Sequence, residues 1–253
     1  MLALWHAESL ELMRALPAAC VDGVITDPPY SSGGAFRGDR VTRNATAKYI
    51  SGEDRHLYAH DFHGDTRDQR GFAYWCTLWL SEAYRLTKPG GIVALFIDWR
   101  QLPTLTDAVQ AAGWSWRGVA VWDKKAGRPQ KGRFKAQAEF IVWGSKGGMP
   151  LDGPCHHGVF RCTVPRGKSH PTEKPVDMLR DVVKIARPGG VILDPFMGSG
   201  AVGEAALSEG YGFLGCELSA HYAEASAARL AQITSTIAPE RRTQLDPILA
   251  GAA

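Results

Sequence analysis

The stretch "VILDPFMGSGAVGEAA", residues 191–206, decides the fold. An apolar strand ends in an acid, a glycine-rich turn follows, and a helix of small residues begins after it. Gly198, Gly200 and Gly203 have the G-x-G-x-x-G spacing, in which the backbone can approach a ligand closely at a helix N-terminus. Glu217 ends the next expected strand, where an acid can accept hydrogen bonds from ribose hydroxyls. The stretch predicts a nucleotide-type cofactor site; a tight turn with glycines kept only for packing is the alternative.

Asp194, the acid at the end of this strand, narrows the choice of ligand. A carboxylate beside the turn suits a pyrophosphate poorly, because both are negative, and suits a ligand with an ammonium group well. S-adenosylmethionine has an ammonium group and no phosphate. We therefore expect S-adenosylmethionine as the cofactor.

Outward from this stretch, expected strands alternate with expected helices over most of the chain, as the apolar periodicity predicts. The strands are expected at 2–6, 21–27, 88–98, 114–122, 138–144, 189–194 and 212–218, and the helices at 9–17, 71–87, 102–113, 175–186, 201–210 and 220–233. This alternation is typical of an α/β fold with a mostly parallel, doubly wound sheet covered on both faces.

Composition and length agree with one soluble globular domain over residues 1–253, since 45% of the residues are hydrophobic and 22% are charged. No apolar run is long enough to span a bilayer, and the N-terminus has no basic leader. Five irregularly spaced cysteines argue against a disulfide framework. We expect a protein of the reducing cytoplasm with no membrane partner.

Two segments, 31–70 and 145–170, are rich in polar residues or glycine and show no period, so we expect loops there. The net charge is only +3, but residues 117–174 hold twelve Lys and Arg against four acids, a local balance of +8. Such a stretch indicates a polyanionic partner or a solvated basic face. "CHHGVFRC", residues 155–162, matches no closed zinc pattern, so no metal is expected.

The chain resembles the amino DNA methyltransferases in three motifs: "DPPY" at 27–30, "HPTEKP" at 170–175 and "LDPFMGSGAVGEAA" from residue 193. The catalytic motif precedes the glycine-rich motif, which resembles the permuted β group. The resemblance implies a seven-stranded, doubly wound, Rossmann-like sheet that holds S-adenosylmethionine. It also implies methyl transfer to an exocyclic amino group of DNA, adenine N6 or cytosine N4.

The catalytic tetrapeptide comprises Asp27, Pro28, Pro29 and Tyr30. An aromatic amino nitrogen is a poor nucleophile because its lone pair is delocalised into the ring. If the Asp27 carboxylate and the Pro28 carbonyl accept its hydrogen bonds, the nitrogen can pyramidalise and offer that lone pair to the methyl group. The prolines fix the backbone, and Tyr30 is expected to stack on a base flipped out of the duplex. Asp27, where many cytosine-N4 enzymes have Ser, favours adenine, with cytosine N4 as the alternative.

The resemblance assigns further cofactor residues, and these match the family's usual residues at some positions and depart from them at others. The family usually has Gly-Asp where this chain has Ala7-Glu8, so Glu8 is either a cofactor contact or a helix-start acid. Thr172 and Lys174 match positions that hold the methionine end of the cofactor. The expected cofactor site comprises Glu8, His170, Thr172, Lys174, Asp194, Phe196, Gly198, Ser199, Gly200, Glu217 and Leu218.

Double-stranded DNA is the partner that the resemblance implies. The segment 123–169, with its basic loop, is the expected region of DNA contact, and only about 145–169 is left for target recognition. The 31–70 loop is expected to close over the flipped base. The family often dimerises, and the tryptophans at 75, 79, 114 and 116 suit core or interface packing. The expected phosphate or base contacts are Lys124, Lys125, Arg128, Lys131 and Arg133.

Two other classes of function fit part of these motifs. Methyltransferases acting on RNA or on protein amides usually carry Asn before Pro-Pro and keep the cofactor motif first, and both features count against them here. A nicotinamide-dependent oxidoreductase would explain the glycine-rich turn but would leave "DPPY" and "HPTEKP" without a role.

Overall fold

The computed structural model describes residues 1–30, 67–127, 129, 131–150, 153–164 and 173–236. The loop expected over the catalytic motif therefore lies almost wholly outside the described residues. So do three of the expected site residues, Arg128, His170 and Thr172.

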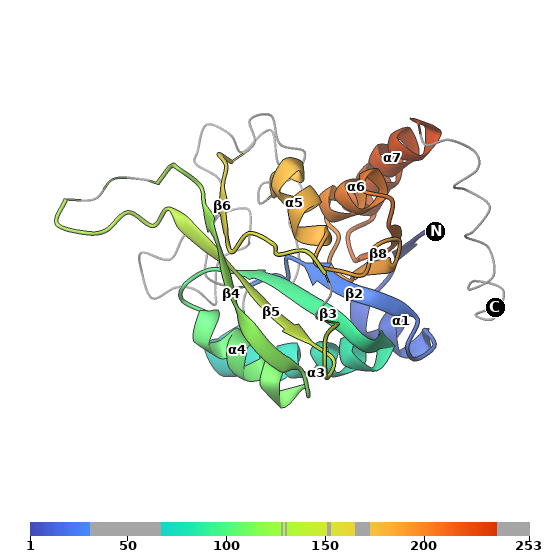
Figure 1. Ribbon diagram of the computed structural model, residues 1–253, viewed down its shortest axis with the longest axis horizontal. Helices are drawn as coiled ribbons and strands as arrows, with labels where there is room; N and C mark the ends of the chain where they lie inside the picture. Colours follow the sequence, from blue (N-terminus) through green and yellow to red (C-terminus); the bar gives the residue numbers. More distant parts are fainter. Residues whose placement is uncertain (31–66, 128, 130, 151–152, 165–172, 237–253) are drawn as a thin grey trace.

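The described strands form one eight-stranded sheet in the order β1-β8-β7-β2-β3-β5-β4-β6 (Figure 1). β1, β8, β7, β2 and β3 run parallel to one another, whereas β5 is antiparallel to both β3 and β4. The mostly parallel α/β prediction is confirmed. The bounds are β1 Leu2–His6, β2 Val21–Thr26, β3 Thr87–Ile97, β4 Ser115–Asp123, β5 Ala138–Ser145, β6 Val159–Arg161, β7 Val191–Asp194 and β8 Gly212–Glu217.

The eighth strand, β6, lies inside the segment expected to be a loop, so that expectation was wrong at these three residues. β6 pairs in parallel with β4, where Trp122 is opposite Phe160. The Trp122 indole N–H also donates to the Cys162 carbonyl oxygen at 2.9 Å. Three residues are too few to show an alternating pattern, so this pairing depends on tertiary contacts that the local sequence does not display.

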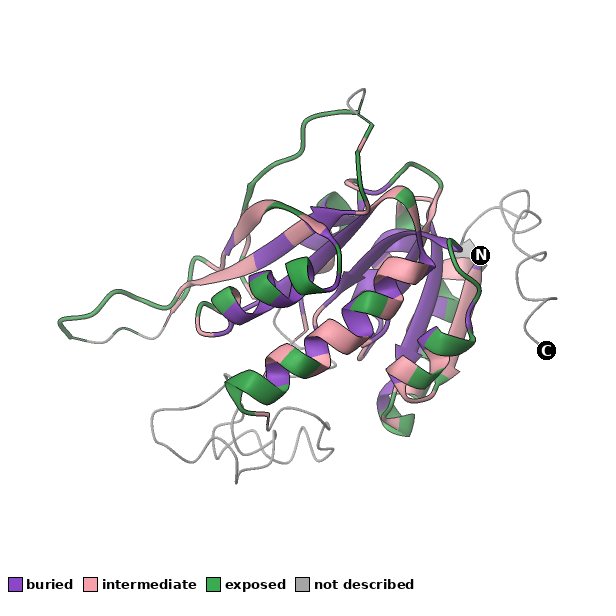
Figure 2. Ribbon diagram, turned by 90° about the horizontal axis from the view of Figure 1, so that it is seen from below, coloured by how far each residue is buried: buried purple, intermediate pink, exposed green. Residues whose placement is uncertain are grey.

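Six described helices form two layers. α1 (Ser9–Ala15), α3 (Gln69–Leu86) and α4 (Leu102–Ala111) cover one face of the sheet, and α5 (Val176–Val183), α6 (Ala201–Ser208) and α7 (Ala220–Thr236) cover the other (Figure 1). Buried strands lie between the layers, and the helices turn exposed stripes outward (Figure 2). Among the helices described here, none combines the length and the apolar character needed to cross a membrane.

The chain reverses its direction of winding between β2 and β7, which are neighbours in the sheet. From β2 the chain passes through α3 to β3 on one side, and from β7 it passes through α6 to β8 on the other. Gly23 and Val24 of β2 pair with Ile192 and Leu193 of β7. Open α/β sheets bind ligands outside the carboxyl ends of the strands at such a switch point. Asp27 follows β2 and Asp194 ends β7, so both acids lie at this position.

Candidate active site

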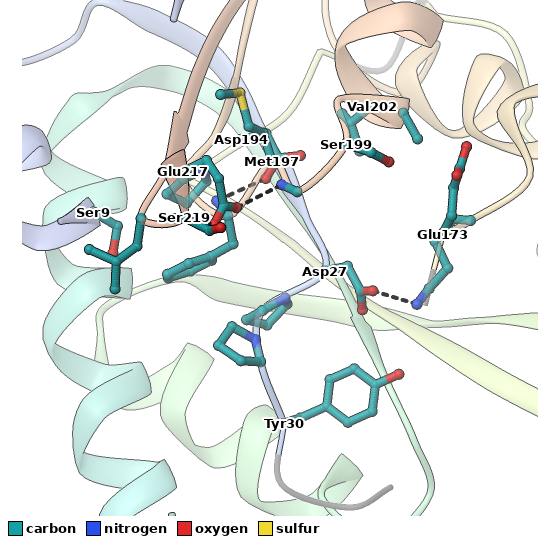
Figure 3. A pocket seen from close by; sticks show the side chains of 18 of the residues that line it. Ser9, Asp27, Tyr30, Glu173, Asp194, Met197, Ser199, Val202, Glu217 and Ser219 are labelled. Atoms are coloured by element: carbon teal, nitrogen blue, oxygen red, sulfur yellow. Dashed lines mark hydrogen bonds and ion pairs between the residues drawn. The ribbon is translucent and has the colours of Figure 1, made fainter. Parts of the chain in front are cut away.

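A cavity of about 300 Å³ opens at this edge of the sheet (Figure 3). Six segments line it: the residues after β1, the residues after β2, the start of α3 with Arg67 before it, the segment leading into α5, the glycine-rich turn, and the end of β8. Of the expected cofactor residues that the structure describes, Gly200 alone is not part of the lining. The expected residues that line it are Glu8, Asp27, Pro28, Pro29, Tyr30, Lys174, Asp194, Phe196, Gly198, Ser199, Glu217 and Leu218.

The glycine-rich turn serves both backbone geometry and packing. Gly200 is the N-cap of α6 and has a left-handed conformation with φ of 81°, which side-chain-bearing residues rarely adopt. At Gly203 an added Cβ would lie 2.7 Å from a Phe213 ring carbon and 2.8 Å from a Leu230 methyl carbon. The turn therefore lets α6 start beside the cavity and pack closely on β8.

Two acids, at the ends of β7 and β8, accept hydrogen bonds from the backbone of the turn. The Glu217 carboxylate accepts hydrogen bonds from the Gly198 N–H at 3.0 Å and the Ser219 N–H at 2.8 Å. Asp194 Oδ1 accepts from the Thr26 hydroxyl at 2.5 Å and the Phe196 N–H at 3.1 Å. Burial raises the pKa of Asp194 to about 7, because desolvation outweighs these two hydrogen bonds. Both carboxylates face the cavity.

Glu8 caps α1. One of its carboxylate oxygens accepts from the Glu11 N–H at 2.9 Å and the other from the Ser9 hydroxyl at 3.3 Å. The helix-start interpretation is therefore confirmed. Because Glu8 also lines the cavity, a contact with the cofactor stays a prediction.

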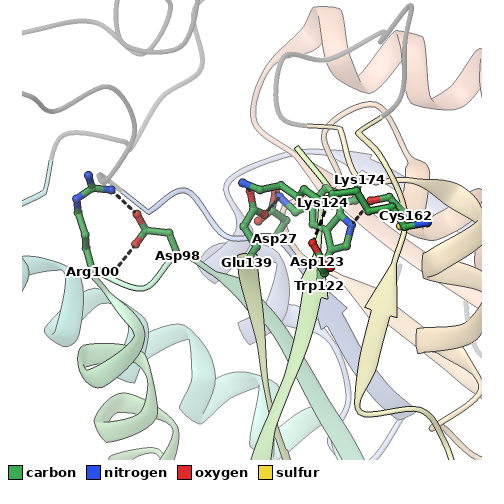
Figure 4. A network of polar contacts seen from close by, with 10 residues as sticks. Asp27, Asp98, Arg100, Trp122, Asp123, Lys124, Glu139, Cys162 and Lys174 are labelled. Carbon is green, nitrogen blue, oxygen red and sulfur yellow. Dashed lines mark hydrogen bonds and ion pairs between the residues drawn. The ribbon is translucent and has the colours of Figure 1, made fainter. Parts of the chain in front are cut away.

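Asp27 is held by a chain of charged side chains (Figure 4). The Lys174 ammonium donates to Asp27 Oδ2 at 2.5 Å and lies 3.4 Å from Glu139 Oε2. The Lys124 ammonium in turn donates to Glu139 Oε1 at 3.1 Å. Asp27 Oδ1 is buried and accepts no hydrogen bond from any described residue. Lys174, expected at the methionine end of the cofactor, thus has its ammonium beside the carboxylate that is expected to be catalytic.

The charges in this chain stabilise one another. Burial raises the pKa of Asp27 more than the Lys174 charge lowers it, and Glu139 raises it further. Burial also lowers the pKa of Lys174, but the attraction of the two carboxylates outweighs that effect and the net pKa is raised. For Glu139 the two lysines outweigh burial, so its pKa is lowered. The arrangement is a charged ammonium between two carboxylates.

Glu139 was not predicted from the sequence, although a signal for it exists. It is the second residue of β5, whose following residue, Phe140, pairs with Ile97 at the end of β3. Because β5 is antiparallel, its start lies at the edge where the parallel strands end. An acid at the start of a late antiparallel strand is therefore a candidate site residue in such a sheet.

An aromatic wall closes one side of the cavity. The Phe196 ring lies 5.2 Å from both the Trp75 and Trp79 rings, measured between centroids. The Arg67 guanidinium lies 4.2 Å from the centroid of the Trp75 ring. Trp79 is buried core as expected, but Trp75 also lines the cavity, together with Arg67.

The expected DNA contacts divide into two groups. Lys125, Lys131 and Arg133 are exposed on the connection between β4 and β5, which projects away from the sheet (Figure 1). Lys124 is instead turned toward Glu139, with only 20% of its side chain exposed. The local excess of cations is therefore displayed mainly on the projecting connection.

Comparison with known proteins agrees with this geometry. A family model described as "DNA methylase", for N6 and N4 methyltransferases, matches residues 21–154 and 153–228. Type II methyltransferase M.Cfr9I of Citrobacter freundii is 27% identical over 264 residues, covering 90% of this chain and 87% of that protein.

Two solved structures share the fold. The M1.HpyAVI–SAM complex superposes with a TM-score of 0.63 at 22% identity, covering 91% of this chain and 99% of that one. PvuII DNA methyltransferase, described as cytosine-N4-specific, gives a TM-score of 0.66 at 17% identity, covering 92% and 90%. Since the family model spans most of the chain, the protein belongs to the N6/N4 DNA methylase family.

Proposed function

We propose that this protein transfers a methyl group from S-adenosylmethionine to the N6 amino group of an adenine flipped out of double-stranded DNA. The observation that carries the proposal is Asp27 Oδ1, a buried acceptor without a described partner, in the lining of a cavity that the glycine-rich turn also lines. Asp27 Oδ1 and the Pro28 carbonyl are the acceptors for the two amino hydrogens.

The charges of the cavity suit the proposed cofactor. S-adenosylmethionine supplies, when bound, an electrophilic methyl group on a sulfonium sulfur. Cationic groups of a ligand would be attracted by the carboxylates, whereas a dinucleotide would bring its pyrophosphate against them. This contrast counts against a nicotinamide-dependent oxidoreductase. The acids in the lining are Glu8, Asp27, Glu173, Asp194 and Glu217, and the Lys and Arg residues are Arg67 and Lys174.

The residues of the chain then act on the amino group of the base. Hydrogen bonds to Asp27 Oδ1 and the Pro28 carbonyl favour a pyramidal nitrogen whose lone pair is free to form the new N–C bond. Forming that bond would break the bond between the methyl group and the cofactor sulfur. The positively charged nitrogen must then lose one proton, which the Asp27 carboxylate is positioned to accept. The Tyr30 ring, in the same lining, is available to stack on the base.

The choice of adenine depends on Asp27, because a carboxylate is a stronger acceptor than the serine found in many cytosine-N4 enzymes. Cytosine N4 is the second candidate, and the cytosine-N4-specific PvuII enzyme has the same fold. Both bases present a planar amino group, so the same acceptors would serve either. One product analysis distinguishes them.

The test is incubation of the protein with unmethylated genomic DNA and S-adenosylmethionine, followed by digestion to nucleosides and mass spectrometry. We expect N6-methyladenine, and none with Asp27→Ala. N4-methylcytosine would keep the mechanism and overturn the choice of base. Bound cofactor without any methylated base in DNA would overturn the proposed substrate.

A further inference from the structure

We propose that Lys174 and Glu139 are positioning residues for the methyl acceptor: Lys174 engages one oxygen of Asp27 so that the other is presented to the target amino group, and Glu139 holds Lys174 in place. This inference rests on the proposed function. Its physical basis is the asymmetry of the Asp27 carboxylate, whose Oδ2 is bonded to Lys174 and whose Oδ1 is unpartnered among the described residues.

The Lys174 ammonium is confined from several sides. Only 5% of the side chain is exposed. The ammonium lies 5.4 Å from the centroid of the Phe96 ring and 5.9 Å from that of Tyr30, besides its two carboxylates. A side chain so enclosed has few other rotamers, so it fixes the rotation of the Asp27 carboxylate. Fixed rotation matters because an acceptor displaced by about 1 Å can lower the rate roughly 100-fold.

Glu139 completes the arrangement from the opposite side. It comes from β5, whereas Asp27 follows β2 and Lys174 precedes α5, so three separate segments meet at one ammonium. Lys124, just after β4, bonds the second oxygen of Glu139 at 3.1 Å. Without Glu139, Lys174 would lose one of its two described carboxylate partners and gain freedom to move toward the cavity that it already lines.

A purely structural role explains these charges less well. A buried ion pair often contributes little net stability, because desolvation of both groups opposes their attraction. Well-packed apolar side chains could fill the same space at similar stability. The charges are arranged around the catalytic carboxylate, where orientation and ionisation decide the rate.

The test compares Glu139→Gln and Lys174→Met with wild type in single-turnover methyl transfer across a range of pH, with cofactor affinity measured by calorimetry. Among the described residues, the charged groups that act on Asp27 are Lys174, Glu139 and, at the end of the neighbouring strand β7, Asp194. We expect Glu139→Gln to bind S-adenosylmethionine within about twofold of wild type and to transfer methyl groups roughly 10- to 100-fold more slowly.

The pH profile separates positioning from simple loss of structure. The negative charge of Glu139 raises the pKa of Asp27, and the positive charge of Lys174 lowers it. The acidic limb of the rate profile should therefore move to lower pH in Glu139→Gln and to higher pH in Lys174→Met. Limbs that stay in place or move the same way would overturn the inference, as would a wild-type rate in Glu139→Gln. Asp181→Asn, on an exposed ion pair of α5, is the matched control and should change nothing.

A second measurement does not require turnover. The ¹⁵N signal of the Lys174 ammonium, assigned from its loss in Lys174→Met, should shift in both Asp27→Asn and Glu139→Gln. If wild type methylated no DNA but these shifts occurred, the proposed function would fail while the pairing stood. Absence of the shifts would overturn the pairing itself.

Discussion

Replacing Thr26 by Val tests the buried contact that links β2 to β7. Thr26 is fully buried, Asp194 is 2% exposed, and the Thr26 hydroxyl donates to Asp194 Oδ1 at 2.5 Å. Valine has nearly the same shape but cannot donate. The variant should therefore lose this hydrogen bond while keeping the packing of the strand.

The loss of stability in Thr26→Val depends on the charge of Asp194. Below pH 7 the carboxyl is mostly neutral, since its pKa is about 7, and losing a neutral hydrogen bond costs about 0.5–1.5 kcal/mol. Above pH 7 it is ionised, and losing a hydrogen bond to a charged group costs about 1.5–3 kcal/mol. The destabilisation should thus be larger by about 1 kcal/mol at pH 8.5 than at pH 5.5. By linkage, that difference corresponds to a pKa of Asp194 raised by roughly 0.7 in the variant.

Stability falls as the pH rises, because the pKa of Asp194 is raised in the folded protein. The folded-state pKa of Asp194 is raised from its ordinary value of 3.8 to about 7, so folding favours the neutral carboxyl. Its contribution to stability is complete below about pH 4 and is lost as the pH rises to 7. In Thr26→Val this loss continues to higher pH, since the hydrogen bond that lowered the pKa is gone.

The assay is urea denaturation of the cofactor-free protein at pH 5.5 and 8.5. Thr26→Val is compared with wild type, and the same substitution is made in an Asp194→Asn background. In that background the effect of Thr26→Val should be independent of pH. An equal destabilisation at both pH values with Asp194 intact would refute the reasoning.

Three further predictions concern the cofactor pocket, the DNA and the thiols. Arg229→Gln should weaken S-adenosylmethionine binding about tenfold in calorimetry, because the Arg229 guanidinium donates a hydrogen bond at 2.8 Å to Glu173, which lines the cavity. Unchanged affinity would show that this hydrogen bond does not support cofactor binding. Lys131→Gln should reduce the salt dependence of DNA binding by about one unit of slope, through loss of one phosphate contact; an unchanged slope would place Lys131 off the DNA. In native protein at pH 8, Cys155→Ser should abolish rapid modification by a disulfide reagent. Cys155 is exposed, whereas burial raises the pKa of Cys76 to about 12 and also raises that of the partly buried Cys162; a fast phase that persisted would contradict the prediction, because it would come from a thiol other than Cys155.

Much of the fold followed from local patterns, because each long strand and helix carries its own periodicity. β2, which is buried throughout, is indicated by Val21, Val24 and Ile25, and the turn beginning at Gly198 identifies the start of α6. β6 is too short to carry a pattern, and its pairing with β4 exists only in the folded chain.

The candidate site was predictable where a motif carries the residue and not where the topology brings it in. Asp27 and Asp194 were found from their motifs. Glu139 lies beside them because β5 runs antiparallel to β3, and no local sequence pattern reveals that direction. Lys174 lines the same cavity, but its partner at 2.5 Å is Asp27, and the sequence alone contains no information on that distance.

The most direct test of the central claim is the single-turnover rate of methyl transfer by Asp27→Asn, measured beside its affinity for S-adenosylmethionine. If the amide oxygen of the variant faces the Lys174 ammonium, the amide NH₂ faces the target amino group, which places a donor against a donor. We predict a rate roughly 100- to 1,000-fold below wild type, with any loss of cofactor affinity much smaller than the loss of rate. A rate within about threefold of wild type would contradict the claim that the Asp27 carboxylate is the acceptor on which methyl transfer depends.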